Sequence, residues 1–139
     1  MARKDYSDIA QCVRRHYPGT QALYLFGSYG TDDEHPESDV DLAVLLPPAE
    51  AKAVGGLVLG ACWQMLTDLL GRPIDLINLR QTNTVLQHEI IHTARLIDCP
   101  SPREKDFFET DVMGLYQKLN QERAGIIEEI VRSGRVLTP

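Results

Sequence analysis

The amino-acid sequence predicts one α/β (α+β) domain in which helices flank a small mixed sheet. The first observation is length, because 139 residues suffice for one buried core but not for two independent catalytic domains. The second is the alternation of short apolar runs, typical of strands, with longer segments of helical periodicity. We therefore assign residues 1–139 to a single domain that includes a C-terminal helical region at about residues 101–135.

Four short segments predict the strands of the sheet. Ala22–Phe26 is apolar and aromatic and ends at a Gly-Ser pair, and Val40–Leu46 is an almost continuous apolar run. Pro73–Leu79 alternates between apolar and polar residues, and Leu96–Cys99 is a further short strand. The polar residues 29–38 predict a loop between the first two strands.

The remaining segments predict helices. Apolar residues recur at helical spacing over residues 6–17, and a second helix is predicted at about Thr84–Ala94. Between them, residues 49–70 predict one long helix ended by Gly71, the residue type favoured just after a helix. Apolar residues cover almost its whole circumference, so we expect it to be buried on more than one side.

The last third of the chain, residues 104–132, predicts a helix with an apolar stripe. Its members are Phe108, Val112, Leu115, Leu119, Ile126 and Ile130. Gly125 interrupts the stripe and predicts a bend or a second short helix, because glycine weakens a helix interior. The stripe either packs on the sheet of the same domain or forms an interface with a partner.

Composition and cysteine spacing exclude several classes of protein. The 20 acidic residues outnumber the 14 basic ones, and a net charge of −6 opposes non-specific binding to nucleic acid. No apolar signal-peptide core or membrane-length apolar run is present, so we expect a cytoplasmic protein without a membrane partner. Cys12, Cys62 and Cys99 contain no Cys-x-x-Cys pair and indicate buried thiols rather than a disulfide framework or zinc knuckle.

Asp39 and Asp41 are the residues most indicative of chemistry. Positions two apart in a strand point to the same face, so these carboxylates are predicted to project side by side. In an otherwise apolar strand, unpaired carboxylates are costly without a cation. Mg²⁺ prefers hard oxygen ligands and is commonly held by one or two carboxylates together with substrate phosphates. The pair therefore predicts a magnesium site.

Three further residues are predicted to face the same cavity. Gly27 lets the backbone approach a phosphate, and the hydroxyl of Ser28 can donate to it. Asp75 points away from its apolar strand neighbours and would either bind a second metal ion or act as general base. Acidic ligands beside a Gly-Ser turn suit phosphoryl or nucleotidyl transfer, with Asp39, Asp41 and Asp75 as catalytic and metal-binding residues.

The pattern Gly-Ser-x10-Asp-x-Asp resembles the signature of the DNA polymerase β nucleotidyltransferase superfamily, most closely its minimal members. Across residues 23–94 the chain is similar to MNT-domain antitoxins, the partners of HEPN ribonuclease toxins in two-gene modules. The resemblance implies a nucleotidyltransferase fold. It also implies an enzyme that uses ATP and Mg²⁺ to transfer AMP onto a tyrosine of the toxin and thereby silences it.

This sequence departs from the family pattern directly after the Gly-Ser pair. Relatives often carry a small residue and an arginine there, whereas residues 29–32 read Tyr-Gly-Thr-Asp. A triphosphate contact is then missing or supplied elsewhere, for example by Arg72, Arg80 or Lys52, each of which is also an ordinary surface charge.

Alternative functions follow from other features. A non-catalytic antitoxin could cover its toxin while retaining a degenerate site, and a nucleotidyltransferase could act on a small molecule or an RNA end. A zinc peptidase is a more distant alternative, because His88-Glu89-x-x-His92 fits a known zinc pattern. That reading leaves the strand aspartates unexplained, and both histidines fall opposite the apolar stripe of their helix.

Overall fold

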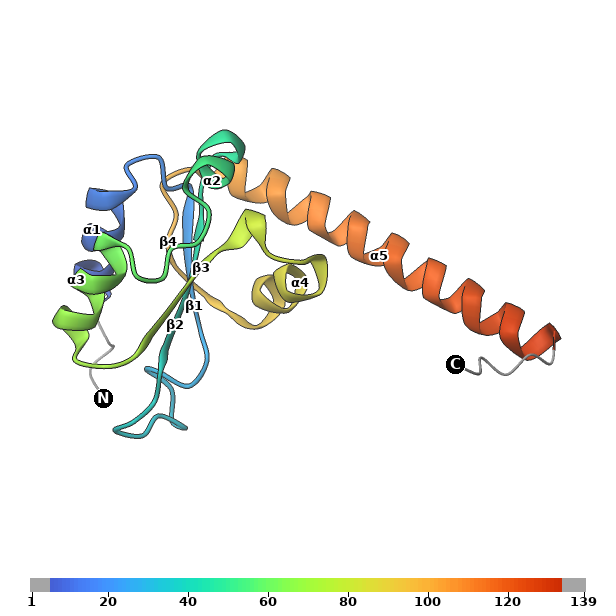
Figure 1. Ribbon diagram of the computed structural model, residues 1–139, viewed down its shortest axis with the longest axis horizontal. Helices are drawn as coiled ribbons and strands as arrows, with labels where there is room; N and C mark the ends of the chain where they lie inside the picture. The colour runs from blue at the N-terminus through green and yellow to red at the C-terminus, as the bar shows by residue number, and fades with distance from the viewer. Residues whose placement is uncertain (1–5, 134–139) are drawn as a thin grey trace.

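The computed structural model describes residues 6–133 and contains a four-stranded sheet with helices on both faces (Figure 1). The strands are β1 (Ala22–Phe26), β2 (Val40–Leu45), β3 (Ile74–Asn78) and β4 (Arg95–Asp98). The helices are α1 (Ser7–His16), α2 (Pro48–Val54), α3 (Ala61–Leu70), α4 (Thr84–Thr93) and α5 (Pro102–Ser133), with a 3-10 helix at Leu79–Gln81. The predicted fold class is confirmed, and residues 134 and 135 of the predicted helical region lie outside the described part of the chain.

The sheet is mixed, as predicted, with strand order β3-β2-β1-β4. β1 pairs antiparallel with both β2 and β4, whereas β2 and β3 run parallel. Such a parallel pair needs a long crossover, which α2 and α3 provide. Because β2 and β3 run parallel, their first residues lie at the same edge of the sheet as the end of β1.

Alternate strand residues contribute to two separate apolar layers. One layer packs against α1 and α3 and contains Leu23, Leu25, Val40, Leu42, Val44, Ile74 and Leu76. The other packs against α4 and the beginning of α5 and contains Ala22, Tyr24, Ala43, Leu45, Leu79, Ile90, Phe108 and Val112. By this alternation Asp41 and Asp75 belong to the second face, at its edge.

The single helix predicted for residues 49–70 is wrong. Gly55 has a φ of 62°, a conformation that ends α2, and α3 begins only at Ala61. In the intervening loop Leu57 is 2% exposed and fills the core, whereas Leu59 is 81% exposed. The predicted burial on more than one side is also wrong, because α3 presents exposed apolar residues such as Met65 to the outside.

The predicted bend in the last helix is wrong as well, since α5 is continuous over 32 residues. One internal glycine, Gly125, costs only about 1 kcal/mol and does not stop a long helix. Phe108 and Val112 are buried in the core, but Leu115 and Ile126 are 55% and 59% exposed where α5 extends away from the sheet (Figure 1). Within residues 6–133, no helix combines the length and apolarity that a membrane crossing requires.

Candidate active site

Asp39, Asp41 and Asp75 lie at the end of the sheet where β1 ends and β2 and β3 begin, and we call this end the acidic edge. Asp41 lies at its centre. It stands opposite Phe26, the last residue of β1, and opposite Asp75 of β3 in the parallel register. Paired residues on neighbouring strands share a face, so the Asp41 and Asp75 side chains lie on the same side of the sheet. Asp39 lies one residue before β2 begins, rather than inside the strand as predicted. The apolar cluster under α4 and α5 includes Ala43 and, at its margin, Phe26 opposite Asp41.

The three aspartates interact electrostatically. Partial burial raises the pKa of Asp41 above its ordinary value, and the negative charges of Asp75 and Asp39 raise it further. Within the described residues, neither a salt bridge nor a hydrogen bond links any of the three to a basic side chain. The carboxylate oxygens of the three aspartates do not all lie within 4.8 Å of one another. Asp39 and Asp75 are therefore neighbours of Asp41, but the three carboxylates do not form one compact cluster.

Gly27 has a close steric relation to Asp41. Its φ is +78°, a region that side-chain-bearing residues rarely adopt. A Cβ at this position would lie 3.2 Å from Cγ of Asp41 and would overlap its Oδ2. The absence of a side chain at Gly27 therefore leaves the space that the Asp41 carboxylate occupies.

Ser28 is held by a residue that the sequence reasoning missed. Its hydroxyl donates a hydrogen bond to Oγ of Ser38 at 3.0 Å, and the same oxygen accepts from the backbone N–H of His35 at 2.9 Å. Ser38 is only 3% exposed. Ser38 directly precedes Asp39, so its hydrogen bond links the Gly-Ser turn to the segment that carries Asp39 and Asp41. Its position next to Asp39 is the sequence signal that could have identified it.

Two arginines fix the loop that follows the Gly-Ser turn. Arg72 donates to the carbonyl oxygens of His35 and Ser38 at 3.1 and 3.4 Å, and it lies 3.6 Å from a carboxylate oxygen of Glu34. Its partners are therefore in the loop rather than at Asp75. Arg95 of β4 donates to the carbonyl oxygen of Tyr29 at 2.8 Å. Sequence reasoning missed Arg95, because only the pairing of β4 with β1 brings it beside this turn.

The other two candidate triphosphate contacts lie away from the acidic edge. Arg80 donates to the carbonyl oxygen of Leu46 and, at 2.7 Å, to Oε1 of Gln21. It follows the far end of β3, five residues after Asp75, which is roughly 16 Å along a strand. Lys52 is exposed on α2, which follows the far end of β2. Neither residue is placed to contact a phosphate at Gly27.

The histidine pair of α4 does not form a metal site with a third ligand. The His88 ring stacks on Tyr116 of α5 with centroids 3.5 Å apart, and the His92 ring lies 4.1 Å from the His88 ring. Nδ1 of His92 is hydrogen-bonded to the carbonyl oxygen of His88 at 2.9 Å. Among residues 6–133 no acidic, histidine or cysteine side chain completes a three-ligand group with this pair. The rings act as a packing contact between α4 and α5.

The donor set at the acidic edge fits a divalent cation of the magnesium type. All candidate ligands there are hard carboxylate oxygens, and partial burial together with the negative charges of Asp75 and Asp39 raises the pKa of Asp41. Asp39 and Asp41 could hold the ion, with Asp75 as an additional ligand or base. Gly27 and Ser28 lie directly beside it, where a phosphate chain could approach.

Comparisons with known proteins agree with this chemistry. Residues 8–103 match the family described as polymerase beta, nucleotidyltransferase. A curated relative from Shewanella oneidensis, the protein adenylyltransferase MntA, is 28% identical over 131 residues, covering 94% of this chain and 91% of the relative.

Solved structures with the same fold are toxin–antitoxin complexes. One, a toxin–antitoxin with AMP-PNP, has a TM-score of 0.72 and 28% identity, and the match covers 92% of this chain and 99% of the matched one. Another, a tri-AMPylated Shewanella oneidensis HEPN toxin in complex with MNT antitoxin, has a TM-score of 0.64 and 26% identity, with 90% and 94% covered.

Proposed function

The chain belongs to the polymerase beta nucleotidyltransferase family, and from that premise we propose that it is an antitoxin with protein adenylyltransferase activity. It transfers AMP from ATP onto a tyrosine of a cognate HEPN ribonuclease toxin and thereby neutralises the toxin. The observation that carries this proposal is the placement of Asp41 between Gly27 and Asp75, with Asp39 beside it. The relatives support the same activity, since one is named a protein adenylyltransferase and another is bound to an AMPylated toxin.

The reaction requires a nucleophile, a phosphate-binding turn and a way to offset negative charge. The hydroxyl oxygen of the acceptor tyrosine attacks the α-phosphorus of ATP, a new P–O bond forms, and the bond to the β-phosphate breaks with release of pyrophosphate. A Mg²⁺ ion bound at the acidic edge would neutralise charge on the triphosphate and orient it.

The residues of the chain then have separate roles. Asp39 and Asp41 would hold the ion, Gly27 lets the backbone approach the phosphates, and the hydroxyl of Ser28 would exchange its hydrogen bond to Ser38 for one donated to a phosphate oxygen. Asp75 either accepts the proton of the acceptor hydroxyl or binds a second ion, and its position opposite Asp41 is compatible with both. Arg72 and Arg95 hold the turn and its loop in place through backbone carbonyl groups.

A non-catalytic antitoxin that neutralises by covering the toxin is the main alternative, because α5 carries exposed apolar residues such as Leu115, Ile127 and Val131. A covering role does not explain why Gly27, with a φ of +78°, leaves space for the Asp41 carboxylate. It also does not explain why the negative charges of Asp39 and Asp75 lie near Asp41. A small-molecule or RNA acceptor would use the same transfer chemistry. The molecule that receives AMP from labelled ATP distinguishes these acceptors from a toxin.

The test separates transfer from binding. Asp39→Asn should reduce labelling of a HEPN toxin by ATP at least roughly 1,000-fold, because the metal loses a charged ligand, while the two proteins still co-purify. Asp68→Asn, an exposed aspartate on α3, is the matched control and should label the toxin at the wild-type rate. If Asp39→Asn neutralises the toxin as well as wild type does, the protein acts by covering.

A further inference from the structure

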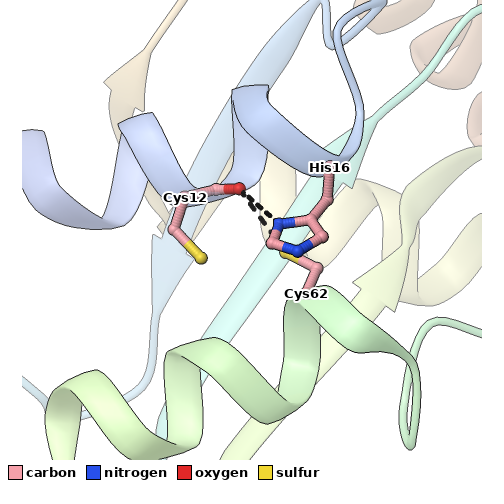
Figure 2. A group of neighbouring side chains, drawn as sticks. All are labelled: Cys12, His16 and Cys62. Carbon is pink, nitrogen blue, oxygen red and sulfur yellow. Dashed lines mark hydrogen bonds between the residues drawn. The ribbon is translucent and has the colours of Figure 1, made fainter.

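A second group of metal-binding side chains lies on the opposite face of the sheet from the aspartates. Cys12 and His16 are four residues apart on α1, and Cys62 lies in the first turn of α3. One potential ligand atom from each of the three lies within 4.8 Å of those of the other two (Figure 2). Among residues 6–133, no other three histidine, cysteine, aspartate or glutamate side chains place their ligand atoms within 4.8 Å of one another. The mechanism proposed above uses none of them.

The histidine is already oriented as a metal ligand would be. Nδ1 of His16 lies 2.9 Å from the carbonyl oxygen of Cys12 (Figure 2). A carbonyl can only accept, so Nδ1 is the donor, and Nε2 is the ring nitrogen left for a metal. A backbone carbonyl that fixes the tautomer in this way is a frequent outer partner of metal-bound histidine. Positions four apart on a helix also place Cys12 and His16 on one face.

Burial favours a metal whose charge the thiolates cancel. Cys12 and Cys62 are 7% and 1% exposed, so an unpaired thiolate at either position would be costly. When a divalent ion binds, two S–H bonds are replaced by two metal–sulfur bonds and two protons leave to solvent. One Zn²⁺ with two thiolates has no net charge, so the complex avoids the cost of a buried ion.

The group borders a cleft and needs only a small contraction. The cleft, of about 270 Å³ between α1 and α3, is lined by Cys12 together with Arg15, Met65 and Leu69. Tetrahedral zinc with bonds of about 2.0–2.3 Å requires ligand atoms about 3.4–3.8 Å apart. Side-chain rotations that move atoms by about 1 Å satisfy this requirement.

We propose that Cys12, His16 and Cys62 form a zinc site, with water in the fourth position, that cross-links α1 to α3. Two thiolates and one imidazole in tetrahedral arrangement are a ligand set typical of Zn²⁺. The absence of a Cys-x-x-Cys pair hid this group from the sequence, because Cys62 comes from a helix 50 residues further along the chain.

Co²⁺ is a spectroscopic probe for such a site. Untagged, reduced and metal-free protein titrated with Co²⁺ should develop thiolate-to-cobalt charge-transfer absorption at one equivalent, and Zn²⁺ should then displace the cobalt. The absorption should be lost in Cys62→Ser and retained in Cys99→Ser, because Cys99 is outside the group. It should also be retained in Asp39→Asn, since the acidic edge supplies no sulfur.

Thermal unfolding gives a second, independent readout. One equivalent of Zn²⁺ should raise the Tm of wild type and of Cys99→Ser and should leave the Tm of His16→Ala unchanged. His16 is only half-buried, so this variant folds even if Cys62→Ser does not. The proposal is overturned if no charge-transfer absorption develops, if it persists in both Cys62→Ser and His16→Ala, or if the thiols oxidise to a disulfide instead of binding metal.

Discussion

Gly27 and Asp41 are so close that a side chain on Gly27 would overlap the Asp41 carboxylate. Gly27→Ala places a methyl group where Oδ2 of Asp41 lies, so the carboxylate must rotate away. We predict that AMP transfer falls at least roughly 100-fold, since misplacement of a catalytic group by about 1 Å has effects of that size. The measurement is the initial rate of toxin labelling at saturating ATP.

Gly71→Ala is the matched control for this substitution. Gly71 ends α3 with a φ of +63°, and a Cβ there meets nothing within 4 Å. Both alanines are in the left-handed region and should lower the free energy of unfolding by about 1–2 kcal/mol. Equal losses of transfer rate in the two variants would show that Gly27 contributes only backbone freedom.

The raised pKa of Asp41 predicts a pH-dependent stability effect. Between its pKa in the unfolded chain and its higher pKa in the folded protein, the folded state binds more protons. The free energy of unfolding therefore falls as pH rises through this window and remains lower at neutral pH. Without metal, Asp41→Asn should have a higher Tm than wild type at pH 7, and the difference should shrink as pH falls below about 4.

Thermal unfolding in a chelator at both pH values checks this effect. A Tm advantage that is the same at both pH values would mean that charge at Asp41 is not the cause. Such a result would leave the transfer chemistry untouched. Higher stability together with lost activity is expected where function requires a strained or charged site.

Much of the candidate site could be predicted at the residue scale. The Gly-Ser turn and the aspartates follow from spacing, because strand alternation alone puts Asp39 and Asp41 on one face. The parallel pairing brings Asp75 opposite Asp41, on the same face of the sheet. The loop contacts of Ser38 and Arg95 could not be predicted, since they depend on the path of a loop and on the register of β4.

At the scale of elements, strands were more predictable than helices. All four strand boundaries agree with prediction to within one residue, because buried strands are short apolar runs between turn residues. The prediction of one helix at residues 49–70 was wrong because the apolar pattern continues through Gly55, whose positive φ ends α2. The apolar stripe of α5 was predicted either to pack on the sheet or to form an interface with a partner. In the structure Phe108 and Val112, near the beginning of α5, pack in the core.

The exposed end of α5 carries the next prediction. Ile127 and Val131 are 61% and 76% exposed and lie four residues apart on one helix face. If the toxin covers this face, Ile127→Glu combined with Val131→Glu should weaken the complex at least roughly 10-fold, or about 1.4 kcal/mol. The free energy of unfolding of the free protein should change by less than about 0.5 kcal/mol.

The control places the same charges elsewhere on the helix. Gln117 and Gln121 are exposed and polar and also lie four residues apart, so glutamates there should leave the dissociation constant unchanged. Isothermal titration of toxin into each variant measures the difference. Equal affinity for all three proteins would place the toxin interface somewhere other than this end of α5.

For the whole molecule, the sheet separates two kinds of chemistry. Hard carboxylate oxygens gather at the edge of one face, and two thiols with an imidazole lie behind the other, between α1 and α3. Hard oxygen ligands suit Mg²⁺, and thiolates with an imidazole suit Zn²⁺, so the two faces favour different ions. The net charge of −6 makes a metal-bound nucleotide a better ligand than a bare polyanion.

The intact mass of a cognate HEPN toxin tests the central claim most directly. After incubation with this protein, ATP and Mg²⁺, the toxin should gain the mass of one or more AMP groups, and peptide mapping should place them on tyrosine. The gain should disappear when Asp41→Asn replaces the wild type. A toxin that is bound and neutralised by the wild-type protein, yet keeps its unmodified mass, would contradict the account.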